Sequence, residues 1–130
     1  MTSERFAALP KPPYYAVIFS SQRNAHGEAD YHAAADALFA IVQGQPGFLG
    51  VESTRDGDGF GITVAYFDSE ENIRRWRNEA THAATRERGK REWYEHFEVR
   101  VAKVERAYGG PHNEAVAATA DPATAAPAAG

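Results

Sequence analysis

The sequence contains no cysteine, and this absence excludes disulfides, thiolate catalysis, iron–sulfur clusters and cysteine-ligated metals. It also has no excess of basic residues: the formal net charge is -4, which argues against a nucleic-acid-binding protein. No apolar run approaches the roughly 18 residues of a membrane-spanning helix, and the N-terminus lacks a basic-then-apolar signal pattern. We therefore expect a soluble, cytoplasmic protein with neither a nucleic-acid nor a membrane partner.

The length of 130 residues predicts one domain between two flanking segments. Residues 1–13 contain three prolines, so we expect an extended lead-in. Residues 109–130 form a tail rich in alanine and proline, which we expect to be disordered because these side chains bury little apolar surface. The folded domain is then expected over residues 14–108.

Hydrophobic periodicity predicts four strands and two helices. The strands are expected over residues 14–21, 48–55, 60–67 and 93–107, and the helices over residues 28–43 and from Asp68, as N-cap, to about Gly89. Asp-Gly pairs between the second and third strands predict a tight hairpin, because glycine supplies the positive φ of such turns. In the last strand the apolar residues shift from one set of alternating positions to the other, which predicts a β-bulge near Ala102 and Lys103.

The order β-α-β-β-α-β is typical of a ferredoxin-like α+β fold, an antiparallel four-stranded sheet with both helices on one face. On the third strand, small residues share a face and leave room for something to lie close above it. The other sheet face also carries apolar residues, and a domain of this size has nothing left to cover it. We therefore expect a homodimer whose sheets face each other.

The segment NIRRWRNEATH in the second helix raises the question of function. Asn72 lies one turn before Trp76, so both side chains project from the same part of the helix. Trp76 suits a core position or a pocket wall, and the Asn72 amide either extends the capping network or holds a substrate oxygen. His82 would lie about 120° from Trp76 on a straight helix. It shares a pocket with Trp76 only if the helix bends or restarts near residues 79–81.

Other sites of chemistry are absent from the sequence. The five histidines have no i, i+4 spacing and no HExxH motif, so no metal site is expected. DGDGFG joins two strands and is a turn rather than a phosphate-binding loop. The aromatic pair Trp93–Tyr94 is a further candidate for a pocket wall.

The segments QPGFLGVES, GFGITVAYFDSEENIRRW and WYEHFEVRVAKVER resemble the antibiotic biosynthesis monooxygenase (ABM) family of dimeric α+β barrels. The resemblance covers residues 14–108 and implies the ferredoxin-like fold, the dimer and a cofactor-independent monooxygenase acting on a small aromatic or enolisable substrate with O2. Two alternatives of the same fold stay open: a haem-binding or haem-degrading member, and a non-catalytic protein that binds a small ligand.

The resemblance also implies site residues. The pocket motif Asn-x-x-x-Trp matches Asn72 and Trp76, while the tyrosine that the monooxygenases place six residues beyond the tryptophan is His82 here. The haem-degrading branch places its iron-ligating histidine about ten residues after the tryptophan, where this chain has Arg86.

Histidine titrates near neutral pH, so we expect His82 to be the catalytic base. Asn72 is expected to be the second catalytic residue, as a donor to the oxyanion. The side chains expected to bind substrate are those of Trp76, Tyr94, Tyr66 and Trp93.

Overall fold

The computed structural model describes residues 5–111. Residues 1–4 of the expected lead-in and residues 112–130 of the expected tail lie outside the described residues. Its elements are β1 (Tyr14–Arg23), α1 (Glu28–Val42), β2 (Phe48–Arg55), β3 (Phe60–Phe67), α2 (Glu70–Asn78), α3 (Ala80–Arg88), a π-helical turn η2 (Gly89–Trp93) and β4 (Tyr94–Val104). This order confirms the ferredoxin-like arrangement, with the second helix divided in two. Between residues 5 and 111, none of the helices combines the length and the hydropathy of a membrane-spanning segment.

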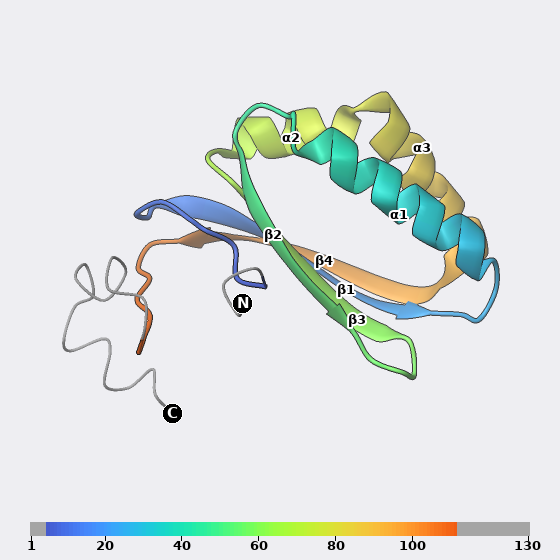
Figure 1. Ribbon diagram of the computed structural model, residues 1–130. Coiled ribbons are helices and arrows are strands. Elements are labelled where there is room, and N and C mark those ends of the chain that lie inside the picture. Colours follow the sequence, from blue (N-terminus) through green and yellow to red (C-terminus); the bar gives the residue numbers. More distant parts are fainter. Residues whose placement is uncertain (1–4, 112–130) are drawn as a thin grey trace.

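The four strands form one antiparallel sheet in the order β2-β3-β1-β4, and the helices lie over one of its faces (Figure 1). In its middle, Val17 of β1 pairs with Ala65 of β3 and Val101 of β4. The prediction of a bulge near Ala102 and Lys103 is wrong, because the register is continuous there. It shifts instead at the start of β4, between the pairs Gln22–His96 and Arg23–Tyr94, where the chain leaves η2.

The helix-facing side of the sheet carries the small residues of β3. Arg55 of β2 reaches Tyr31 of α1 across this face and lies so close over Gly61 that a Cβ there would be 2.8 Å from its Cζ. A side chain at Gly61 would therefore push Arg55 away from α1.

The opposite face of the sheet, here called the back face, is partly covered by the N-terminal lead-in. The Ala7 amide donates to Glu52, whose carboxylate also accepts from the Tyr66 hydroxyl. Elsewhere on this face Phe60 and Ile62 of β3 are 46% and 38% exposed. A patch of apolar surface therefore remains open on this side of the described chain.

The break between α2 and α3 occurs at Glu79, whose backbone is extended (φ -61, ψ 133). The Glu79 carboxylate accepts from the His82 amide at 3.0 Å and so caps the first turn of α3. A single straight helix over this segment, as the sequence suggests, is therefore replaced by two short ones.

The N-cap of α2 is Ser69 rather than the predicted Asp68. The Ser69 hydroxyl accepts a hydrogen bond from the backbone N–H of Asn72, while the Asp68 carboxylate accepts one from the side-chain amide of Asn72. Asp68 is still held in the preceding turn, because its own backbone N–H donates to the carbonyl of Gly47.

Gly47 generates a test of this junction. Its φ is +75, and a Cβ there would collide with Asp68 Oδ1 and Asn72 Nδ2. We expect Gly47→Ala to lower the free energy of unfolding by about 1–3 kcal/mol, since both the backbone strain and the collision oppose folding. Gly57→Ala is the matched control, because a Cβ at Gly57 meets nothing within 4 Å. Equal midpoints of thermal unfolding in the two variants would contradict the prediction.

Candidate functional site

Trp76 and His82 form a stacked pair at the junction of α2 and α3. Their ring centroids are 4.2 Å apart and their planes differ by 15°. On a straight helix the two side chains would point in different directions. The extended residue Glu79 redirects α3 so that the imidazole returns over the indole. The sequence predicts that Trp76 and His82 share a site only if the helix bends or restarts near residues 79–81, and the structure shows such a restart.

The tautomer of His82 follows from one hydrogen bond. Its Nδ1 lies 2.9 Å from the Trp76 carbonyl oxygen. A carbonyl only accepts, so Nδ1 carries the hydrogen and Nε2 carries the lone pair in the neutral ring. Within residues 5–111, Nε2 has no hydrogen-bond partner. The ring therefore presents a free proton-accepting atom.

Burial lowers the pKa of His82 below its usual value. The bond to the Trp76 carbonyl and the charge of Glu79 oppose this shift, while the positive charges of Arg86 and Arg77 add to it. The net effect favours the neutral imidazole at neutral pH, which is the form that can accept a proton.

Arg86 lies one turn beyond His82 on α3. Its Nη2 donates to the Arg77 carbonyl at 3.1 Å, at the C-terminal end of α2. Its Nε is buried and has no acceptor among the described residues. The sequence drew attention to Arg86 only as the residue that replaces a haem-ligating histidine. Its i, i+4 spacing from His82 is a signal for a shared site once the restart of the helix at residue 80 is known.

Asn72 is tied into the start of α2. Its Nδ2 donates to Asp68 Oδ1 at 2.8 Å, and its backbone N–H is bonded to Ser69. The structure thus shows the capping network as one role of this side chain. The second amide hydrogen has no partner among the described residues and remains available one turn before Trp76.

Trp93 and Tyr94 lie at the junction of η2 and β4. Trp93 is 2% exposed, and its carbonyl accepts from Arg23 Nε, so it is a core residue. Tyr94 packs edge-on against Phe19, with the ring centroids 5.4 Å apart. Burial and a hydrogen bond to Tyr31 raise the pKa of Tyr94, so its hydroxyl stays protonated.

Tyr66 lies on the back face of the sheet, away from the helices. Its hydroxyl donates to Glu52 Oε1 at 2.8 Å, and its ring packs edge-on against Tyr14. Burial, followed by the hydrogen bond to Glu52, raises the pKa of Tyr66. The structure therefore does not bring Tyr66 together with His82.

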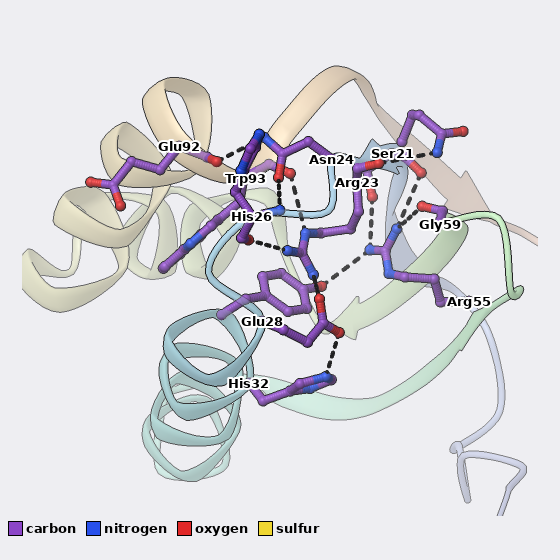
Figure 2. Close-up of polar contacts among 12 residues, drawn as sticks. Ser21, Arg23, Asn24, His26, Glu28, His32, Arg55, Gly59, Glu92 and Trp93 are labelled. Atoms are coloured by element: carbon purple, nitrogen blue, oxygen red, sulfur yellow. Dashed lines mark hydrogen bonds and ion pairs between the residues drawn. The ribbon is translucent and has the colours of Figure 1, made fainter.

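A second cluster, which the sequence did not indicate, gathers Arg23 at the end of β1, Glu28 of α1 and Arg55 of β2 (Figure 2). Arg23 is 5% exposed and lies 3.8 Å from the Tyr31 ring centroid, while Arg55 donates to the Tyr31 hydroxyl. The Arg23 guanidinium donates to Glu28 and to the carbonyls of Trp93 and His26. The sequence pattern placed Arg23 in a loop, but β1 extends through it. Because each of its nitrogens has an acceptor, this cluster is a structural one.

A shallow, open hollow of about 420 Å³ lies between α1 and α3. It is lined by Ala34, Ala80, Thr81, Ala84, Thr85, Arg88 and Trp93, and not by His82 or Trp76. In the described part of the chain, no three histidine or acidic side chains gather as a metal site would require.

Comparison with known proteins agrees with this architecture. Residues 14–88 match the family model described as antibiotic biosynthesis monooxygenase. The uncharacterized protein YqjZ of Bacillus subtilis is 50% identical over 97 residues, which are 75% of this chain and 84% of that protein. SnoaB, a cofactor-independent oxygenase from Streptomyces nogalater, has the same fold (TM-score 0.63, 14% identity, 76% of this chain, 100% of SnoaB). So does Rv0793 from Mycobacterium tuberculosis (TM-score 0.61, 16% identity, 78% and 98%). This chain therefore belongs to the antibiotic biosynthesis monooxygenase family.

Proposed function

We propose that this protein is a cofactor-independent monooxygenase that oxidises a small aromatic or enolisable substrate with O2. One observation carries the proposal: His82 stacks on Trp76 in a tautomer that leaves Nε2 free to accept a proton. Membership of the family supports it, and so does the shared fold of SnoaB, which is named a cofactor-independent oxygenase.

In the proposed reaction, His82 Nε2 removes a proton from an activated C–H group of the substrate. The resulting carbanion, delocalised over the ring system, transfers electrons to O2 and forms a carbon–oxygen bond, and protonated His82 returns its proton to the peroxide oxygen. The second hydrogen on the same carbon then leaves with the outer hydroxyl group as water and a carbonyl group remains, so that one oxygen atom enters the product and the other enters water. Deprotonated substrate is itself the reductant, and no other electron donor is needed.

The other side chains act on the charge and the position of the substrate. The free amide hydrogen of Asn72 donates to the developing oxyanion, which it stabilises more than the neutral ground state. Trp76 provides an aromatic surface beside the base, and Tyr94 provides a second wall on the helix-facing side of the sheet. Trp93 supports this wall from the core, and we give Tyr66 no part in the reaction.

The base assignment is tested with His82→Gln. We expect O2 consumption with anthrone, followed with an oxygen electrode, to fall by roughly 10²–10⁴-fold, the usual contribution of a positioned general base. His26→Gln is the control, because the His26 imidazole is exposed and makes no contact with this site.

Three results would contradict the proposal. Unchanged O2 consumption in His82→Gln would show that His82 is not the catalytic base. Haemin binding with a Soret shift that His82→Gln abolishes would favour the haem-binding alternative. A wild-type protein that binds anthrone without consuming O2 would be the non-catalytic binder.

We also propose that the protein is a homodimer joined through the back face of the sheet. The exposed side chains of Phe60 and Ile62 on this face support the proposal, because burial against a second copy removes their apolar surface from water.

Ile62→Asp tests the dimer. A carboxylate buried in an apolar interface is costly, so we expect sedimentation analysis to show a dimer for the wild type and a monomer for this variant. Ala29→Asp adds the same charge to the exposed first turn of α1 and should leave the dimer intact. A wild-type monomer at micromolar concentration would refute the proposal.

A further inference from the structure

The charge around His82 is unbalanced. The groups that act on it are Arg77 on α2, Arg86 on α3 and Glu79 between the helices. The Glu79 carboxylate is already bonded to the backbone of α3. Within residues 5–111, neither arginine forms an ion pair with a carboxylate. The candidate base therefore lies in a locally positive environment.

Arg86 is the incomplete member of this group. One bond, from Nη2 to the Arg77 carbonyl, holds its guanidinium, while its Nε is buried without an acceptor. Leaving a buried donor unpaired costs free energy, because the group loses its bond to water and gains none in return. An acceptor oxygen that reached Nε would remove this cost.

The same chain shows how it satisfies a guanidinium that is structural. Arg23 is more deeply buried than Arg86, and its Nε, Nη1 and Nη2 each have an acceptor, one of them the Glu28 carboxylate. No such set surrounds Arg86, although it lies beside the only stacked aromatic pair in the described part of the chain. Among the described residues, Arg86 Nε therefore lacks the kind of acceptor that Arg23 Nε has.

We infer that Arg86 binds the carboxylate of an acidic aromatic ligand whose ring lies against Trp76 and whose reacting group faces His82 Nε2. This inference rests on the proposed function for the identity of the site and names its substrate class. Side chains four residues apart on a helix have Cβ atoms about 5–6 Å apart. One fused aromatic ring system bridges this distance, so that one end meets Arg86 and the other meets His82. The planar guanidinium suits a carboxylate, to which it can donate two parallel hydrogen bonds.

The test compares two probes that differ by one carboxylate, 6-hydroxy-2-naphthoate and 2-naphthol. Isothermal titration calorimetry with the full-length wild type should show that the naphthoate binds about tenfold or more tightly than the naphthol, as expected for a charge-assisted bond to a buried group. Arg86→Gln should reduce the difference to about twofold or less. Arg74→Gln is the matched control: it removes the same charge from an exposed position on α2 and should keep the preference. Equal affinity of the wild type for the two probes, or a preference that survives Arg86→Gln, would overturn the inference.

A second measurement serves if Arg86→Gln folds poorly. Titration of the His82 ring by NMR should show that bound naphthoate raises the pKa of His82 in the wild type, since its carboxylate offsets the charge of Arg86. Bound 2-naphthol should not raise it. Identical titration curves with the two probes would overturn the inference without any variant.

The outcomes separate this inference from the proposed function. Preference for the naphthoate in a protein that consumes no O2 with anthrone or with an anthrone carboxylic acid would keep the anion site and refute the oxygenase. O2 consumption that depends on His82, in a protein that does not distinguish the two probes, would keep the oxygenase and refute the anion site.

Discussion

The extended backbone of Glu79 is the constraint on which the candidate site depends. It ends α2, starts α3 in a new direction and provides the carboxylate that caps the new helix. A continuous helix would have carried His82 past Trp76, whereas the break stacks the two rings and directs Nδ1 to the Trp76 carbonyl. That carbonyl also accepts from the backbone N–H of Glu79 at 3.1 Å, and a carbonyl oxygen has a second lone pair for the imidazole. The break thus sets both the position and the tautomer of the imidazole.

Two arginines of similar chemistry have different surroundings in this fold. From the end of β1, the Arg23 guanidinium donates to Glu28 of α1, to the Trp93 carbonyl of η2 and to the His26 carbonyl of the loop before α1, and so holds the helix layer to the sheet. Arg86 makes one bond across the break and keeps a buried donor unpaired. A fully paired guanidinium stabilises the fold, while a guanidinium with an unpaired donor can form a further hydrogen bond to an anion. The contrast depends on acceptors rather than on burial alone.

The strands and helices follow periods of two and 3.6 residues, and for this reason the fold class and the hairpin were predictable from the sequence. The break at Glu79 was not, because nothing in the local pattern distinguishes a fading helix from two short ones. The bulge was misplaced for a related reason: a change of parity in a strand does not tell which residue is displaced, and the displacement accompanies η2 at Tyr94. Asn72 and Trp76 were identified from their spacing in the sequence. Arg86 could be assigned to the candidate site only after the structure showed the direction of α3. The partners of Tyr66 depend on which sheet face the helices cover, which periodicity alone does not determine.

The stack of His82 on Trp76 also gives the protein an internal optical reporter. A protonated imidazole in contact with an indole quenches its fluorescence, so we expect the emission of Trp76 to follow the charge of the imidazole ring 4.2 Å away. The other tryptophan, Trp93, lies in the core with Arg88 over its ring and packs edge-on against Tyr31 rather than against His82. The protonation of the His82 imidazole can thus be followed by intrinsic tryptophan fluorescence, without a label.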